Sequence, residues 1–152
     1  MSTRCTLTVF DSEQAFTVYR QSDGYPDTEH GVLAGLRGAL SYAWPLPRFE
    51  PDEFAAAIVA AWKKPAQSHT AFESTYTSQG GNIRLINGNR DSVGDSAFHY
   101  DITQDKRALR VTVFKSIERN GDSRSWKRVK SILLRAKDQP TPPIGQHEEA
   151  ES

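Results

Sequence analysis

Alternating hydrophobic and polar residues mark two strands at the start of the chain. From residue 3 to residue 10, Cys5, Leu7 and Val9 alternate with threonines, a period-two pattern typical of a strand with one buried face. Residues 15–20 continue with aromatic and β-branched side chains after a turn-forming gap at 11–14, which predicts an antiparallel hairpin. We expect Cys5 to be a small core residue and not a nucleophile.

Two helices are expected next. Apolar residues spaced three and four apart between Val32 and Ala43 predict the first helix, with Asp27 or Thr28 as its N-cap and Glu29 in its first turn. Each glycine weakens a helix by about 1 kcal/mol relative to alanine, so packing must hold this one. Its glycines also permit the close approach of another element; they are Gly31, Gly35 and Gly38.

The second helix is predicted to begin at Pro51, a residue suited to the first helical position. Phe54, Ile58 and Trp62 then fall on one face. The run Lys63-Lys64-Pro65 is expected to end the helix, and residues 66–79 are interpreted as a loop.

The remaining strands are predicted over residues 82–86, 97–103, 109–113 and 125–134. In the second of these, alternation places Tyr100 inward with Phe98 and Ile102, and His99 and Asp101 outward. Asn120-Gly121 is the strongest hairpin signal in the chain. The element order ββααββββ predicts an α+β fold, a mainly antiparallel sheet packed against two helices.

The length of 152 residues is enough for one domain with its own core, and we expect a single α+β domain over residues 1–136. Residues 137–152, which are proline-rich and then acidic, are predicted to form a disordered acidic tail. The longest apolar run, residues 54–62, is half the length of a membrane span, and the N-terminus has no signal-like core. We therefore expect a cytoplasmic protein without a membrane partner.

The 19 basic and 19 acidic residues balance overall but are unevenly distributed. Residues 1–105 hold 8 basic and 13 acidic residues, residues 106–135 hold 10 and 2, and residues 136–152 hold 1 and 4. The net charges of these segments are −5, +8 and −3. The basic segment therefore predicts an anionic partner, which is either a ligand or the protein's own acidic surface.

Motifs that specify a catalytic chemistry are absent from the sequence: it has no Walker loop, no HExxH, no CxxC pair and no Gly-x-Ser-x-Gly elbow. The four histidines, at 30, 69, 99 and 147, lack the spacing of metal ligands. We therefore expect neither a metal nor a cofactor, and favour a protein that is not an enzyme.

The segment with the greatest chemical density is Asp23-Gly24-Tyr25-Pro26, which follows Tyr19 and Arg20 and leads into the first helix. A helix N-terminus attracts anions, and an arginine beside aromatic rings can hold a phosphate and a base. A purely structural role, in which Asp23 fixes the turn and Tyr25 packs, accounts for the same residues.

Other candidate ligand-binding residues are supported by single features. Gly81 and Asn82 follow a glycine and allow close backbone approach, or serve only as a hinge. A basic stripe could contact phosphates, with Trp126 as a stacking surface, although basic residues on an exposed strand also protect a sheet edge. The stripe consists of Arg124, Lys127, Arg128, Lys130 and Arg135. Position alone suggests two more anion contacts, Arg4 and Arg48.

Several of these motifs resemble a family of small phage-borne and bacterial proteins of unassigned function. The resemblance rests on Thr3-Arg4, on Tyr19 with Asp23-Gly24-Tyr25-Pro26, and on Gly31 and Leu36. Gln21 stands where that family usually has histidine. A second similar stretch, an acidic and aromatic helix followed by Gly-Gly-Asn and a strand, covers residues 49–85.

Small phage-borne α+β proteins without catalytic residues are often antagonists of host defence, and several such families sequester nucleotide signalling molecules, which guides the leading hypothesis. We expect a non-catalytic, homo-oligomeric binding protein that captures a small phosphorylated ligand, in the manner of a phage sponge for a nucleotide-derived immune messenger. A phosphodiester or nucleotide hydrolase using Asp23 with His99 or His30 is the first alternative. A protein- or nucleic-acid-binding module using residues 125–134 is the second, and nucleic acid is not the favoured partner.

Overall fold

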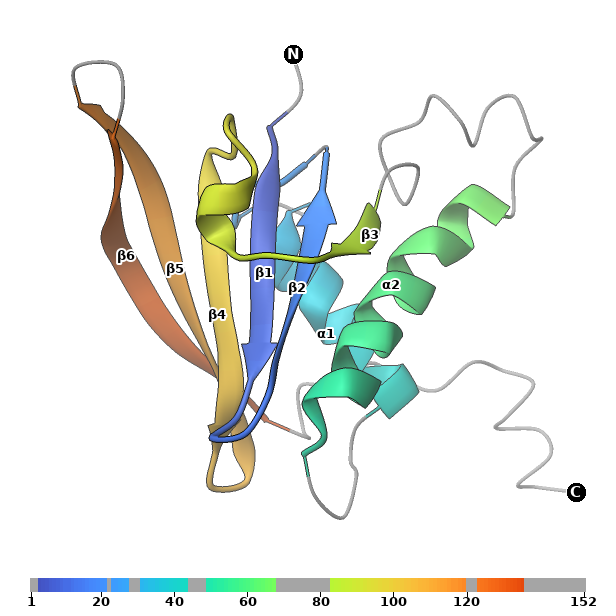
Figure 1. Ribbon diagram of the computed structural model, residues 1–152. Helices are drawn as coiled ribbons and strands as arrows, with labels where there is room; N and C mark the ends of the chain where they lie inside the picture. Colours follow the sequence, from blue (N-terminus) through green and yellow to red (C-terminus); the bar gives the residue numbers. More distant parts are fainter. Residues whose placement is uncertain are drawn as a thin grey trace, which may run out of the picture.

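The computed structural model describes residues 3–21, 23–27, 31–43, 49–67, 83–119 and 123–135. It contains a sheet of six strands and two α-helices, in the predicted order ββααββββ (Figure 1). One short 3-10 helix, η1, was not predicted and lies between β3 and β4. The elements are β1 (Cys5–Phe10), β2 (Ala15–Arg20), α1 (Val32–Ala43), α2 (Pro51–Gln67), β3 (Ile83–Ile86), η1 (Arg90–Ser92), β4 (Phe98–Asp105), β5 (Ala108–Arg119) and β6 (Ser123–Arg135).

The sheet has the strand order β3-β2-β1-β4-β5-β6. β1 and β4 pair in parallel at its centre, and every other neighbouring pair is antiparallel. The fold is therefore α+β with a mainly antiparallel sheet, as predicted. In the β1–β2 turn, Asp11 Oδ1 accepts the amides of Glu13 and Gln14 at 2.8 and 2.9 Å, which explains why this polar gap forms a tight hairpin.

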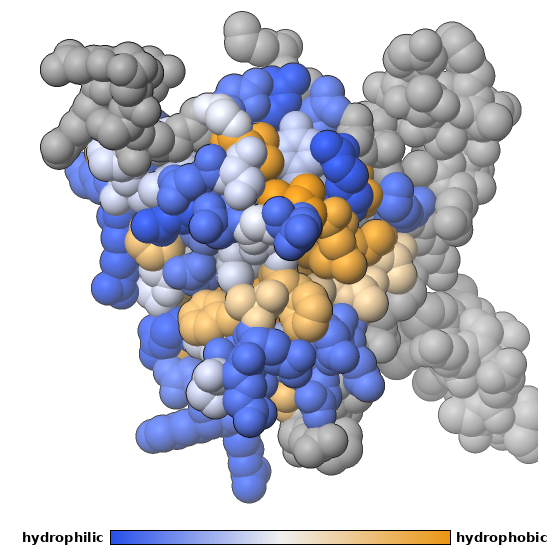
Figure 2. Space-filling view, viewed as in Figure 1, coloured by the Kyte–Doolittle hydropathy of each residue, from blue (hydrophilic) through white to orange (hydrophobic). Residues whose placement is uncertain are grey.

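The two faces of the sheet have different environments. The helix face carries alternate residues such as Leu7, Val18, Tyr100 and Val113, all of them fully buried. α2 packs on this face and α1 packs against α2, so both helices lie on one side of the sheet (Figure 1). The opposite face carries the intervening residues; the loop from β3 crosses in front of β2 and β1, and η1 lies in front of β4 (Figure 1). In the same view, hydrophilic residues cover much of this face and hydrophobic ones gather toward its centre (Figure 2).

Three details of the local structure differ from the sequence predictions. α2 runs two residues beyond Pro65, because a proline in a last turn removes a single amide hydrogen bond. Asp27 does not cap α1: its Oδ1 accepts Lys130 Nζ at 2.8 Å, and α1 begins only at Val32. His99 points to the predicted face but is only 2% exposed, since η1 and aromatic neighbours cover it.

Other predictions fall outside the described residues. They concern Thr28 as a cap, Glu29 in the first turn, the loop after Gln67, Arg48, Gly81 and Asn82, and the tail over residues 137–152. None of the described helices combines the length and hydropathy that a membrane-spanning helix requires.

The close approach predicted for the glycines of the first helix occurs at Gly35. A Cβ on Gly35 would lie 2.7 Å from Trp62 Nε1 and 2.9 Å from Cε2, so the indole of α2 rests directly on the α1 backbone. At Gly38, on the same helix, a Cβ would meet no atom within 4 Å. Contact between the helices therefore depends on one glycine and not on the other.

These two glycines make a matched pair for mutation. Gly38→Ala should raise the free energy of unfolding by up to about 1 kcal/mol through helix propensity. Gly35→Ala gains the same propensity but must displace Trp62, and overpacking costs about 1–3 kcal/mol, so its net effect should be destabilising. Urea unfolding of both variants measures the difference; equal stabilisation by both would contradict the close contact.

Candidate functional site

The Asp23-Gly24-Tyr25-Pro26 turn joins three elements of the fold. Gly24 N donates to Thr3 O at 2.8 Å, and Gly24 O accepts the Tyr100 hydroxyl at 2.6 Å. The carbonyls of the next two residues accept the first amides of α1: Val32 N donates to Tyr25 O at 2.9 Å, and Leu33 N donates to Pro26 O at 3.2 Å. The turn thus connects the entry to β1, the interior of β4 and the first turn of α1.

The residue types of the motif fit this connection. Asp23 has a φ of 57°, in the left-handed region that aspartate tolerates better than most residues, and its Oδ1 accepts the Tyr25 hydroxyl at 2.9 Å. A Cβ on Gly24 would lie 2.8 Å from both Cys5 Cβ and Thr3 O. The motif therefore has a complete structural explanation, which is the second of the two roles considered for it.

The predicted cluster around this turn is divided by the sheet. Arg20 lies on the helix face, only 6% exposed, with its Cζ 4.4 Å from the centre of the Trp62 ring. Burial lowers the pKa of Arg20, and the nearby Asp23 opposes that shift. Tyr19 lies on the opposite face, where Arg84 Cζ is 4.8 Å from its ring centre. The structure therefore does not bring Tyr19 and Arg20 to one ligand.

The expected stacking residue Trp126 belongs to a cluster on the opposite face. Its ring centre is 5.9 Å from that of His99, its Nε1 donates to Asp91 at 3.1 Å, and Arg90 Cζ lies 5.5 Å from its ring. The same Arg90 Cζ is 5.1 Å from the Phe114 ring. Trp126 therefore holds η1 onto the sheet.

His99 forms a hydrogen-bonded chain beneath η1. Its Nδ1 is 2.8 Å from Thr6 Oγ1 and its Nε2 is 2.7 Å from Asp101 Oδ1, so both ring nitrogens are engaged. The hydrolase hypothesis pairs His99 with Asp23, but Asp23 accepts the Tyr25 hydroxyl beside Gly24, which Tyr100 reaches from the helix face. The structure thus pairs His99 with Asp101, and the other histidine of that hypothesis, His30, lies outside the described residues.

The two remaining predicted cations lie at the end of the sheet where β4 begins. Arg4 Nη1 forms an ion pair with Asp95 Oδ2 at 2.8 Å. Arg128 is exposed on β6 opposite Phe114. Neither is adjacent to a cavity that the structure shows among its described residues.

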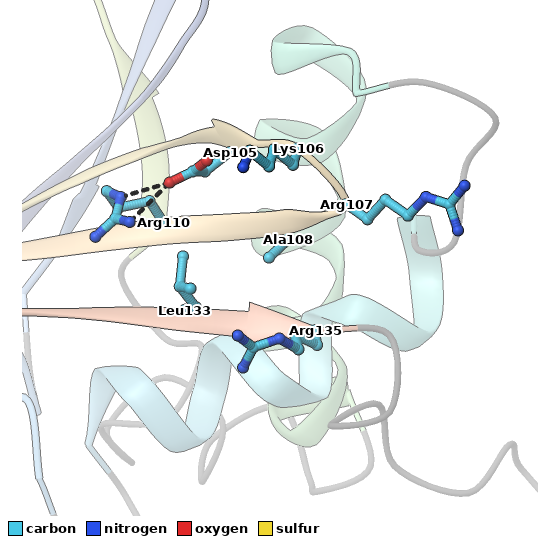
Figure 3. A pocket seen from close by; sticks show the side chains of 7 residues that line it. All are labelled: Asp105, Lys106, Arg107, Ala108, Arg110, Leu133 and Arg135. Atoms are coloured by element: carbon cyan, nitrogen blue, oxygen red, sulfur yellow. Dashed lines mark hydrogen bonds and ion pairs between the residues drawn. The ribbon is translucent and has the colours of Figure 1, made fainter.

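A cationic pocket lies at the other end of the sheet, on the opposite face, where β4 turns into β5 (Figure 3). We name it the hairpin pocket; its volume is about 780 Å³, within the usual range for small-ligand sites of roughly 300–1,000 Å³. Four cations and one carboxylate line it. The lining residues are Asp105, Lys106, Arg107, Ala108, Arg110, Leu133 and Arg135.

Arg110 is held in a fixed orientation in this pocket. Its Nε and Nη2 both donate to Asp105 Oδ2, at 2.9 and 2.7 Å, and its Nη1 donates to Ser131 Oγ at 3.1 Å. A guanidinium has five N–H groups, so two remain for a ligand within the described structure. The side chain is 42% exposed, so those groups are accessible.

The second arginine follows from the strand register. Ala108 pairs with Arg135 and Arg110 with Leu133, so the two arginines are diagonal neighbours on one face. Such neighbours lie about 7–8 Å apart at Cα, within reach of one polyanionic group. Figure 3 shows Ala108 and Leu133 between them as an apolar floor, while Arg107 extends away from the other labelled residues.

The turn of the hairpin pocket is strained. Lys106 has a φ of 59° in a two-residue turn, a place where glycine or asparagine is usual. Such outliers are concentrated at functional sites, because the surrounding structure must over-determine them. Lys106 is exposed and has no ion pair in the described part of the chain.

Among the predicted candidates that the structure describes, Arg135 of the basic stripe lines the hairpin pocket, whereas Arg128 and Trp126 do not. The basic excess of residues 106–135 was the signal that pointed to it, but charge alone does not show which cations converge. The register between β5 and β6 decides which of their side chains share a face and lie close together, and the sequence does not give this register.

No protein-family model, no curated protein and no solved structure matches this chain. The assignment of a site therefore rests on the geometry described above.

The structural role of the turn predicts unequal effects of two hydroxyl deletions. Tyr100→Phe leaves the buried Gly24 carbonyl without its donor and should lower the free energy of unfolding by about 1–3 kcal/mol. Tyr25→Phe removes a part-buried bond and should cost about 1 kcal/mol or less. Equal costs in denaturant unfolding would contradict the connecting role of the Gly24 peptide.

Burial also predicts how stability depends on pH. Desolvation raises the pKa of the fully buried Cys5 thiol to about 12, and burial likewise raises the pKa of Tyr100. The unfolded chain releases the thiol proton near pH 8.5 and the phenol proton near pH 10, while the folded chain keeps both. Neither group therefore changes stability below about pH 8, and above pH 9 the two should lower it by up to about 1.4 kcal/mol per pH unit for each group.

Urea unfolding between pH 7 and pH 10 measures this dependence. Cys5→Ala should flatten the slope between pH 9 and pH 10, because the thiol no longer titrates. Parallel pH profiles for the two proteins would show that Cys5 is not the group responsible.

Proposed function

We propose that this protein is a binding protein that captures a small phosphorylated ligand at the hairpin pocket. The observation that carries the proposal is the convergence of Arg110 and Arg135 on one side of a pocket of about 780 Å³. Planar guanidinium groups bind phosphate in a bidentate manner, and a preoriented one loses less conformational entropy on binding. Asp105 and Ser131 provide that orientation for Arg110.

The charge of the pocket favours an anion with more than one negative charge. Lys106, Arg110 and Arg135 carry positive charge beside the one lining carboxylate, Asp105, which pairs with Arg110. Arg110 keeps two N–H groups for a ligand and Lys106 has no ion pair among the described residues, so an anion with several acceptor oxygens fits this charge better than a mono-anionic carboxylate. A phosphate monoester, a diphosphate or a nucleotide matches it better.

The floor of the pocket favours an organic phosphate over inorganic phosphate alone. Ala108 and Leu133 present apolar surface between the two arginines, where a sugar or base can lie while the phosphates meet the cations.

The residues that line the pocket favour binding of the ligand without its chemical conversion. Asp105 is the one carboxylate among the described lining residues, and two N–H groups of Arg110 engage one of its oxygens. A general base needs a free proton acceptor within reach of the ligand. We therefore propose binding rather than hydrolysis at this pocket.

The test is a thermal-shift panel of linear and cyclic nucleotides, followed by calorimetry on any ligand that stabilises the protein. A ligand at 100 times its dissociation constant should stabilise by about 2.7 kcal/mol. Arg135→Gln should weaken that ligand at least tenfold. Arg4→Gln removes one charge at the far end of the sheet and should leave the affinity unchanged.

The fate of the ligand separates capture from catalysis. Mass spectrometry of the ligand released by denaturation should show it unchanged. A converted product would favour the hydrolase, and the absence of any stabilising nucleotide would contradict the proposed function.

A further inference from the structure

The upper half of the β5–β6 hairpin extends beyond the rest of the sheet. The β4–β5 ladder ends at the pair Phe98 and Lys115, whereas Ser116–Arg119 continue to pair with Ser123–Trp126. In Figure 1 these two strands curve away from β4 and project past it. We call residues 114–128 the ribbon.

A bulge separates the ribbon from the sheet. Val113 pairs with Lys130 and Phe114 with Arg128, so Val129 is the extra residue. A β-bulge bends its strand and increases the local twist, which accounts for the divergence of the ribbon from β4.

The ribbon carries positive charge that the described structure does not neutralise. Lys115 and Lys127 are both exposed and directly opposite each other in the register, and such like-charged pairs destabilise a sheet. Arg128 is exposed as well, and none of the three has an ion pair in the described part of the chain. Across the ribbon the sequence holds five basic and two acidic residues.

The cations lie on both faces of the ribbon. Lys115 and Lys127 share the parity of the helix face, while Arg128 shares that of Phe114 and lies on the opposite face. Exposed apolar side chains accompany them: Ile117 is 39% exposed and Val129 is 49% exposed. A partner that fits this surface must present negative charge to both sides of a narrow ribbon.

We propose that the ribbon binds double-stranded DNA. A major groove about 12 Å wide admits a two-stranded β-ribbon, and its two walls present phosphates to both faces at once. Single-stranded nucleic acid is bound chiefly by stacking bases on aromatic rings. Trp126 does not offer that, because Arg90, His99 and Asp91 already contact its indole.

This surface is separate from the hairpin pocket. Ala108 in the pocket and Lys115 in the ribbon are seven positions apart along β5, which corresponds to about 23 Å. The two cationic regions can therefore be altered independently.

Fluorescence anisotropy with a labelled 20-base-pair DNA duplex between 50 and 200 mM KCl tests the inference. Three neutralised phosphates predict a slope of about −2.7 in log K against log salt, which is about a 40-fold loss of affinity over this range. The double variant Lys115→Ser/Lys127→Ser should reduce the slope by about 2. Because it also relieves the Lys–Lys pair, its melting temperature should not fall.

The matched control is Lys106→Ser/Arg107→Ser, which removes the same charge from the hairpin pocket and should bind the duplex like the unaltered protein. Equal loss in both double variants would mean that only net charge matters and would overturn the proposal. Tighter binding to a single strand of equal length, or to phosphatidylserine vesicles, would also overturn it. So would no binding at 50 mM KCl.

The two proposals fail separately in these experiments. Loss of nucleotide binding in the Lys106→Ser/Arg107→Ser variant with intact duplex binding supports both sites. Duplex binding without any nucleotide binding contradicts the pocket alone.

Discussion

The backbone of Gly24 connects three parts of the fold through its two hydrogen bonds and the residues that follow it. Its N–H meets the chain entering β1 and its carbonyl meets the Tyr100 hydroxyl from β4, so the central parallel pair is joined at one end by a residue outside the sheet. The carbonyls of the following two residues begin α1. Parallel strands cannot be joined by a tight turn, and this contact compensates by fixing the crossover at its start.

Sequence periodicity was sufficient for the architecture because apolar residues alternate with polar ones along the central strands and fill the helix face. Leu7, Tyr100 and Val113 each fall on the expected face. Alternation assigned His99 to the correct face but did not predict its burial, because the rings of Phe114 and Trp126, from other strands, pack against it. The predicted N-cap Asp27 was wrong for a similar reason: Lys130, more than a hundred residues away, takes its carboxylate.

The candidate site was less predictable than the fold. Asp23 and Tyr25 attracted attention because their chemistry is concentrated in the sequence, yet their contacts serve the turn itself. The hairpin pocket has no comparable motif, since Arg110 and Arg135 are 25 positions apart and meet only through strand register. Lys106 also occupies a backbone conformation for which its residue type gives no indication.

The long β5–β6 hairpin separates two kinds of cation. At the β4–β5 turn, Arg110 is positioned by Asp105 and Ser131, which suits recognition of a defined small anion. On the ribbon, Lys115 and Lys127 lie opposite each other without such support. Fixed cations favour specificity, whereas unsupported lysines favour adaptable electrostatic attraction.

The extra residue, Val129, determines which face of the sheet each β6 residue of the ribbon occupies. In an uninterrupted ladder Phe114 would pair with Val129, and Trp126 would stand opposite Ile117, on the side of the sheet away from His99. The bulge instead places Trp126 on the face where it contacts Arg90 and Asp91. One unpaired position therefore determines both the closure over the buried histidine and the outward presentation of the lysines.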